Sequence, residues 1–300
     1  RADRLAFACP VVPQDRFSKR SDREVRSHSV EQYACLAPRR TCMWERPLSL
    51  IADNSDRRMG GANMRMHVAK AYQEELNLLD HKIAQMGGLT EHNLGRAFDA
   101  LNNHDPQLAE RVIMSDAEID RLQAEIEDQV ITMIALRAPL AEDLRHIMAA
   151  LKITGDLERI GDLAKNIAKR SRAIATEQMP KPLIIGLRNM VERALSQLKD
   201  VLDAYADRNA ELALSVWNRD EQIDAMYNSV FRELLTYMME DPRNIGMCTH
   251  LLFGAKNLER IGDHTTNIAE TIHYFVLGRD IEADRPKQDK TSTTLIDPTE

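Results

Sequence analysis

The sequence has few cysteines and no long apolar run, and both absences exclude whole classes of protein. Its four cysteines form no Cys-x-x-Cys pair, and three of them (Cys9, Cys35 and Cys42) fall near the start, so neither a zinc knuckle nor a disulfide framework is supported. No apolar run approaches the roughly 18 residues of a membrane-spanning helix, and no charged-then-apolar signal peptide opens the sequence. We therefore expect a cytoplasmic protein.

An excess of positive charge is also missing. The 300 residues carry a net charge of −7, and no basic stripe is interleaved with aromatic residues. This composition argues against a nucleic-acid-binding protein, whose affinity depends on neutralising phosphates. With 43% hydrophobic residues the chain can bury a core and form one or two domains. Acidic surfaces of this kind suit cations or basic partners.

Residues 1–63 differ from the rest of the chain. They contain four prolines, show no sustained periodicity, and carry 12 basic and 8 acidic residues, a balance of +4 that leaves about −7 − 4 = −11 for the remainder. We predict that this segment is disordered, or that it is an N-terminal extension read from an early start codon, with Met59, Met64 and Met66 as alternative starts. A basic tail that docks on a partner is the functional alternative.

From about Val68 onward the sequence is helical in pattern, and strand signals are absent. Apolar residues at spacings of three and four, from Ile119 to Ile134, predict an amphipathic helix. Prolines and polar turns predict where helices end. The expected breaks are His104-Asp105-Pro106, Ala138-Pro139, Met179-Pro180-Lys181-Pro182, Arg208-Asn209 and Asp241-Pro242. Six long helices follow.

The strongest feature is an internal repeat. The segment Leu-Glu-Arg-Ile-Gly-Asp occurs at 157–162 and again at 258–263, an offset of 259 − 158 = 101 residues. Upstream, Asp116-x-x-Ile119-Asp120 matches Asp220-x-x-Ile223-Asp224. We therefore predict an all-α protein of two tandem three-helix bundles. Repeat 1 spans 67–178, repeat 2 spans 181–278, and residues 279–300 form a loose tail.

Helical spacing divides the repeated segment between a core face and a polar face. Leu157, Ile160, Ala164 and Ile167 share one apolar arc, as do their counterparts in the second copy. The acids stand on a separate stripe, and acid pairs with the same four-residue spacing lie on the preceding helix. Because stacked carboxylates favour a compensating cation, we predict two cation sites. The candidate ligands are Glu158, Asp162, Asn166, Asp116 and Asp120 in repeat 1, and Glu259, Asp263, Asn267, Asp220 and Asp224 in repeat 2.

Oxygen ligands without thiolate select hard cations: Mg, Mn, Fe or Ca ions. The alternative is a solvated face on which the acids pair with Lys165, Arg159 or other basic residues. On spacing alone the two readings stay open.

Other motifs give weaker evidence of function. Glu270-x-x-His273 has the spacing of a di-iron ligand pair, but Lys169 and Arg172 stand at the matching positions of the first copy, so a ferritin-like oxidase is disfavoured. His146 reads as an ordinary surface histidine. Gly161 and Gly262 are expected to allow close approach of helices. Methionines including Met133, Met148, Met238 and Met239 are expected in the core. No phosphate-binding loop, nucleophile elbow or His-Glu-x-x-His motif occurs.

The twice-written Leu-Glu-Arg-Ile-Gly-Asp, each copy followed by Asn-Ile-Ala, together with the two Asp-x-x-Ile-Asp segments, resembles the PhoU family of phosphate-signalling regulators. The resemblance covers roughly residues 67–278. It also includes Met86-Gly87-Gly88-Leu89 and Asp143-Leu144-Arg145. The second copy departs from the pattern, because Arg243-Asn244-Ile245 replaces Asp-Leu-Arg.

The resemblance implies tandem three-helix bundles whose acidic motifs, the four pairs named above, can hold metal clusters. It also implies a cytoplasmic, usually dimeric adaptor that is a negative regulator of the phosphate-starvation response (the Pho regulon) and of phosphate uptake. The implied partners are the sensor histidine kinase PhoR and the ATPase subunit PstB of the Pst transporter. We expect such a signal-transduction protein rather than an enzyme; the alternative is a metal-dependent phosphoester or polyphosphate hydrolase.

Overall fold

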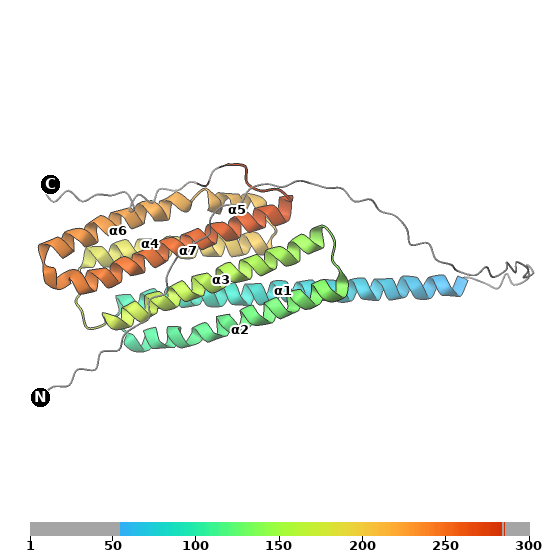
Figure 1. Ribbon diagram of the computed structural model, residues 1–300, viewed down its shortest axis with the longest axis horizontal. Coiled ribbons are helices and arrows are strands. Elements are labelled where there is room, and N and C mark those ends of the chain that lie inside the picture. Colours follow the sequence, from blue (N-terminus) through green and yellow to red (C-terminus); the bar gives the residue numbers. More distant parts are fainter. Residues whose placement is uncertain (1–54, 284, 286–300) are drawn as a thin grey trace, which may run out of the picture. The chain divides into compact units, whose positions relative to one another are not determined.

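The computed structural model describes residues 55–283 and 285, with the helical backbone alone for residues 55–69. This part of the chain is built from helices (Figure 1). They are α1 (Ser55–Asn102), α2 (Pro106–Arg137), α3 (Glu142–Ala173), α4 (Lys181–Ala206), α5 (Ala210–Trp217), α6 (Asp220–Glu240), the short 3-10 helix η1 (Pro242–Asn244) and α7 (Ile245–Leu277). No strand occurs among the described residues, and the predicted all-α class is confirmed.

Every predicted break separates two helices, but the second bundle has one more. Its second helix is divided after Trp217 into α5 and α6, which together take the place of one of the six long helices expected in the described part of the chain. The buried Gln197 side chain donates to the Arg219 carbonyl at 3.0 Å, and the Arg219 guanidinium pairs with Asp200 at 2.6 Å. These contacts from α4 satisfy polar groups that the interruption frees.

The first turn of each bundle is built in the same way. His104 and Arg208 have φ angles of 53° and 50°, the left-handed conformation in which many helices end. The next residue caps the following helix: Asp105 accepts from the Leu108 amide, and Asn209 accepts from the Leu212 amide. The repeat seen in the sequence is thus a repeat of local structure.

The predicted segment 1–63 lies mostly outside the described residues, as does most of the tail 279–300. Helix α1 begins at Ser55, earlier than the apolar pattern indicates. In the tail, residues 279–283 and Arg285 are described, and Arg285 returns to the helices. None of the helices in the described part is both long and apolar enough to cross a membrane.

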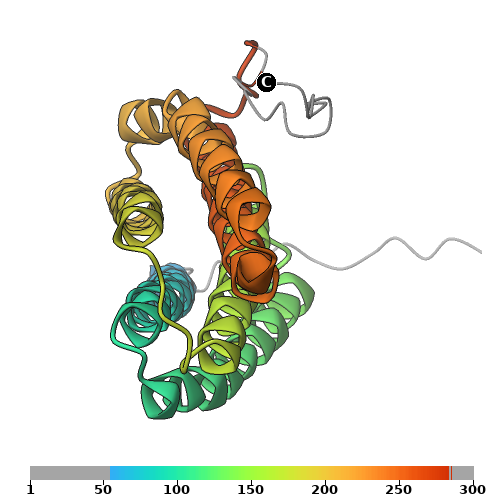
Figure 2. The same cartoon turned by 90° about the vertical axis from the view of Figure 1, so that its left-hand side faces the viewer.

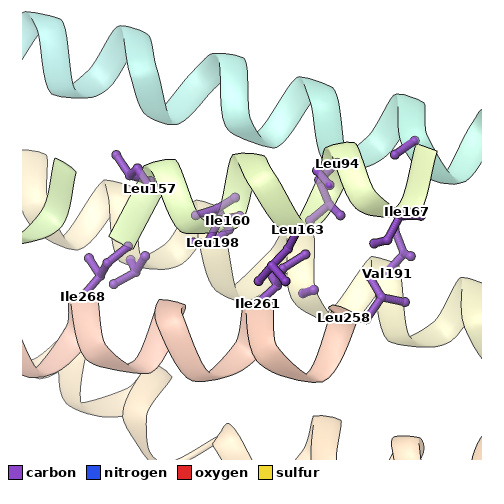
Figure 3. Packing of buried hydrophobic residues seen from close by; sticks show 14 of the residues in the cluster. Leu94, Leu157, Ile160, Leu163, Ile167, Val191, Leu198, Leu258, Ile261 and Ile268 are labelled. Atoms are coloured by element: carbon purple, nitrogen blue, oxygen red, sulfur yellow. The ribbon is translucent and has the colours of Figure 1, made fainter. Parts of the chain in front are cut away.

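The two bundles pack against each other along their third and first helices. Helix α3 packs on α7, and α1 packs on α4, as the end-on view in Figure 2 shows. Figure 3 shows the centre of this contact, where Ile160 and Leu163 of α3 lie beside Ile261 of α7 and Leu157 lies on the side of α3 towards α1. The arc read from the sequence, Leu157, Ile160, Ala164 and Ile167, is buried and therefore confirmed. One core therefore serves both repeats.

Within each bundle the glycine of the repeated segment touches the isoleucine of the upstream motif. A Cβ placed at Gly161 would lie 3.0 Å from Ile119 Cδ1, and one at Gly262 would lie 3.0 Å from Ile223 Cδ1. The expectation that these glycines allow close helix approach is confirmed. This contact holds the two acid-bearing helices of a bundle in register.

Two of the expected core methionines are on the surface. Met133 is buried, but Met148 is 40% exposed and Met239 is 67% exposed. Both lie near the turn that joins the second and third helices of their bundle. A helical stripe predicts which face of a helix is apolar, but it does not predict how far along the helix a neighbour covers that face.

We predict that Gly161→Leu destabilises the fold by about 1–3 kcal/mol, because a side chain there must push α2 away from α3. Gly155, one and a half turns earlier on α3, is the control, since a Cβ there meets nothing within 4 Å. Urea unfolding followed by circular dichroism measures both. Equal stability of Gly161→Leu and Gly155→Leu would contradict the close contact.

Candidate functional site

The predicted acids gather into two clusters, one in each bundle. The first acidic cluster joins α2 to α3 and contains Asp116, Asp120, Glu158, Asp162 and Asn166. The second acidic cluster joins α6 to α7 and contains Asp220, Asp224, Glu259, Asp263 and Asn267. In both, hydrogen bonds link acids of the two helices through a shared basic side chain. The acid-bearing helices of each bundle therefore face each other, as the spacing predicted.

Lys165 is the basic group of the first acidic cluster. Its ammonium donates to Asp162 Oδ1 at 2.7 Å and to Asp116 Oδ2. Asp116 is nearly fully buried on α2, whereas Asp162 is half-buried on α3. Lys165 thus bridges the two helices at the level of the Gly161 contact, where Asp116 Oδ1 would lie 3.6 Å from a Cβ.

The first acidic cluster holds more negative than positive charge. Burial raises the pKa of Glu158, and the Asp162 carboxylate raises it further. Burial also raises the pKa of Asp116, and the hydrogen bond from Lys165 does not offset it. Burial lowers the pKa of Lys165, but its bonds to Asp116 and Asp162 outweigh this and leave that pKa well above its usual value. The pKa values of the acids rise chiefly because the acids are buried, and that of Lys165 rises because two carboxylates accept from it.

Arg285 takes the corresponding place in the second acidic cluster. Its Nε donates to Asp220 Oδ2 at 2.7 Å, and Nη2 donates to Asp263 Oδ1 at 2.8 Å. Nη1 donates to Asn267 Oδ1 at 3.2 Å. Lys165 comes from within its own bundle, but Arg285 comes from the segment that follows α7. The two clusters are therefore closed by different cations from different parts of the chain.

A hydroxyl and a lysine complete the second acidic cluster. Thr266 Oγ1 donates to Asp220 Oδ1 at 2.9 Å, and Lys256 pairs with Glu259 Oε1 at 2.9 Å. The other oxygen of Glu259, Oε2, is buried and has no hydrogen-bond partner. Burial raises the pKa of Glu259, and the Lys256 contact, which lowers it, does not offset the rise. Glu259 Oε2 is therefore an acceptor that no described group uses.

The remaining candidates occupy the edges of the clusters. Asp120 is exposed, yet its charge contributes to the raised pKa of both Asp116 and Glu158, so it lies near them. Asn166 is half-buried on α3. Asp224 is buried on α6, and its charge contributes to the raised pKa of Glu259.

The donor chemistry of both clusters fits a hard cation, but their geometry is set by a side-chain cation. All the gathered donors are carboxylate, amide or hydroxyl oxygens. Among residues 55–283 and 285, no group of three His, Cys, Asp or Glu side chains is arranged to hold a metal ion. A metal entering either cluster would have to replace Lys165 or Arg285. The pairing of acids with Lys165 and Arg159, the alternative left open by the sequence, is observed.

The di-iron spacing of Glu270 and His273 leads to no shared site. Glu270 accepts from Trp217 Nε1 at 2.9 Å, while His273 Nδ1 lies 3.1 Å from the Arg279 carbonyl. The two side chains therefore serve separate structural contacts. Arg285 and Thr266 are the site residues that sequence reasoning missed. Arg285 lies in an aperiodic tail, and Thr266 stands at the position that Lys165 occupies in repeat 1, so the repeat does not conserve the residue type there.

His146 is buried in a polar network and is not the surface histidine expected. Its Nε2 lies 2.7 Å from Asp80 Oδ1, to which the Tyr205 hydroxyl donates at 2.6 Å. Its ring also stacks on Phe275, with 4.9 Å between ring centroids. These four residues come from α1, α3, α4 and α7. The network therefore joins both bundles, which no local pattern in the sequence could indicate.

This network forms one wall of a cavity of about 480 Å³ between α1 and α4. Burial raises the pKa of Asp80, but hydrogen bonds from His146 and Tyr205 outweigh it and leave that pKa below its usual value. Burial and the Asp80 charge raise the pKa of Tyr205, so its hydroxyl keeps its proton. The network is a carboxylate held by two donors.

We predict that Asp80→Asn lowers the free energy of unfolding by about 1–3 kcal/mol, because Tyr205 and His146 lose a charged acceptor. A lowered folded-state pKa contributes stability that is present above the unfolded pKa and is lost as pH falls through the folded pKa. The variant should therefore lose stability less steeply than the wild type below about pH 4.

Asp203→Asn is the matched control, since Asp203 lines the same cavity and its side chain forms none of the hydrogen bonds found among the described residues. Urea unfolding at several pH values measures all three proteins. An acid-side slope that is the same in Asp80→Asn and the wild type would contradict the assigned role of Asp80.

Comparison with known proteins places both bundles in one family. The family model described as PhoU domain matches the chain twice, at residues 83–171 and 187–272. The relative from Rhizobium meliloti, a "phosphate-specific transport system accessory protein PhoU homolog", is 54% identical over 227 residues, which are 76% of this chain and 96% of that protein. The homolog of the same name from Caulobacter vibrioides is 48% identical over 229 residues, 76% of this chain and all of that protein.

Solved structures agree. The crystal structure of PhoU from Pseudomonas aeruginosa superposes with a TM-score of 0.67 at 37% identity, covering 69% of this chain and all of that one. The phosphate transport system regulatory protein PhoU from Streptococcus pneumoniae gives a TM-score of 0.66 at 31% identity, covering 71% of this chain and all of that one.

Proposed function

Because this chain belongs to the PhoU family, we propose that it is an accessory protein of a phosphate transport system and a negative regulator of phosphate uptake and of the phosphate-starvation response. The observation that supports this most is the double match of the PhoU domain, which covers both bundles and both acidic clusters. The names of the relatives and of the solved structures point to the same process.

We infer that each acidic cluster binds a hard divalent or trivalent cation: a Mg, Mn, Fe or Ca ion. The support is the gathering of carboxylates: burial raises the pKa of Asp116, Glu158 and Glu259, and neighbouring carboxylates raise it further. Oxygen donors of this kind prefer hard cations. Asp116, Asp120, Glu158 and Asp162, with Asn166, would hold the ion in the first cluster. In the second, the unpartnered Oε2 of Glu259 would be an additional ligand beside Asp220, Asp224, Asp263 and Asn267.

Removing the central acids should abolish ion binding without unfolding the helices. We expect the variant with Glu158→Gln, Asp162→Asn, Glu259→Gln and Asp263→Asn to retain wild-type helicity and to lose the Mn²⁺ that the wild type binds. Equilibrium dialysis with elemental analysis measures the ion, and circular dichroism measures helicity. Unchanged ion content in the folded variant would refute the site assignment.

Each cluster should bind its metal ion more tightly when its own basic side chain is removed. Lys165→Gln should strengthen ion binding in the first cluster, and Arg285→Gln in the second, each by about tenfold, because the ion no longer competes with a side chain that makes charge-assisted bonds. Calorimetric titration with Mn²⁺ tests this, with Lys169→Gln, an exposed position one turn beyond Lys165, as the control. Weaker binding in either variant would contradict competition.

We propose that the chain acts through contacts and not through turnover. In this proposal a cytoplasmic homodimer links the ATPase subunit PstB of the transporter to the sensor kinase PhoR. The support is the family membership. Phosphoester or polyphosphate hydrolysis is the alternative: release of phosphate from such substrates with Mn²⁺, abolished by Glu158→Gln, would establish it and overturn the regulator proposal.

Deletion of the gene should raise expression of phosphate-starvation genes in phosphate-rich medium, because the repressing contact between transporter and kinase would be lost. A reporter for such a gene measures the effect, and complementation with the wild-type chain is the control. Normal repression in the deletion strain would contradict the proposed regulation.

A further inference from the structure

One end of the first bundle carries apolar side chains that nothing in the described structure covers. The last turn of α2 presents Leu136, 74% exposed, and the α2–α3 turn presents Leu140, 81% exposed. We define the end patch as these two leucines with four further exposed residues nearby. Those four are Leu144 and Met148 on α3, and Tyr274 and Leu277 on α7. Exposed apolar groups gathered at one place indicate an interaction surface.

A cavity joins the α3 and α7 parts of the end patch. It has a volume of about 370 Å³, and Met148 and Tyr274 line it together with Arg145 and Lys152. Arg145 and Lys152 take part in none of the ion pairs found among the described residues. The Nε of Arg145 is buried without a hydrogen-bond partner. Arg145 therefore has hydrogen-bonding capacity that the described residues do not use.

The two acids that line the cavity do not accept hydrogen bonds from Arg145. Glu270 accepts from Trp217 Nε1, and Asp280 is exposed beyond the end of α7. The Arg145 guanidinium lies against the backbone of Gly278, where a Cβ would be 3.6 Å from its Cζ. The guanidinium therefore lies at the C-terminal end of α7, and it retains N–H groups that can donate to a partner.

The turn that carries the end patch is strained. Ala138 and Ala141 have φ angles of 45° and 47°, a conformation that is costly for residues with a Cβ. Ala138 is the C-cap of α2, and its amide donates to the Ile134 carbonyl, so its conformation ends a helix as those of His104 and Arg208 do. Ala141 precedes α3 with a ψ angle of −106° and no side-chain cap, so it is the strained residue of this turn. Backbone strain of this kind occurs at sites of recognition.

We propose that the end patch docks an acidic amphipathic segment of the transporter's ATPase subunit, with apolar side chains on Leu136 and Leu140 and a carboxylate between Arg145 and Lys152. This rests on the proposed role in phosphate transport and identifies the surface that carries it. A second copy of the chain fits less well. A two-fold contact centred on the patch would bring Arg145 towards its own copy and leave both guanidinium groups unpaired.

The test uses the full-length chain and the purified ATPase subunit, with binding measured by biolayer interferometry. Leu136→Asp and Leu140→Asp should each weaken binding at least about tenfold, as for central residues of an interface. Arg145→Gln should weaken it and reduce its dependence on salt. The matched control is Met239→Asp: Met239 is 67% exposed and lies three residues before Pro242, as Leu136 lies three before Pro139. It should bind as the wild type does.

Each outcome decides a different point. All four variants must first give the circular dichroism spectrum and the thermal unfolding of the wild type. If the wild type binds and the patch variants bind equally well, the docking surface is wrong and the transporter role stands. If the wild type does not bind, the transporter role fails and this surface with it. If Leu136→Asp converts a dimer to a monomer in light scattering while ATPase binding persists, the patch belongs to a second copy.

Discussion

The contact between a glycine on the third helix and an isoleucine on the second sets the geometry of each bundle. At Gly161 and Gly262 the absence of a side chain lets Ile119 and Ile223 approach to distances that a Cβ would make tight. Asp162 and Asp263 follow these glycines directly, and Asp116 and Asp220 lie three residues before the isoleucines. In each bundle these two acids consequently bind one basic side chain. Close packing and charge clustering are two results of the same approach of helices.

The clusters created in this way contain more carboxylates than cations. Buried acids that share one base have raised pKa values, and a buried base among several acids keeps its proton. The two bundles meet this imbalance differently, with Lys165 on the same helix in one and Arg285 from beyond α7 in the other. A repeat that is symmetric in its acids is therefore asymmetric in its cations. Any ion or partner that binds both clusters competes with two different groups.

Between the bundles, apolar packing and one polar network make a single body of the described helices. The repeated leucines and isoleucines meet across α3 and α7, and the His146–Asp80–Tyr205 network crosses from α1 and α3 to α4. At the end of α2 this cover stops, which leaves Leu136 and Leu140 in the open. The packed helices thus present an apolar turn at one end, an arrangement suited to recognition by another protein.

The sequence by itself determined the helical class, the repeat, the breaks between helices and the two sets of acids, because helical spacing and proline act locally. It also indicated the roles of Gly161 and Gly262. Only the tertiary structure decided that the second helix of repeat 2 divides at Asn218, that His146 is buried against Asp80, that Met148 and Met239 are exposed, and that Arg285 closes the second cluster. Each of these depends on groups that are distant in sequence and meet only when helices pack. The periodicity of one helix does not predict which groups of other helices contact it.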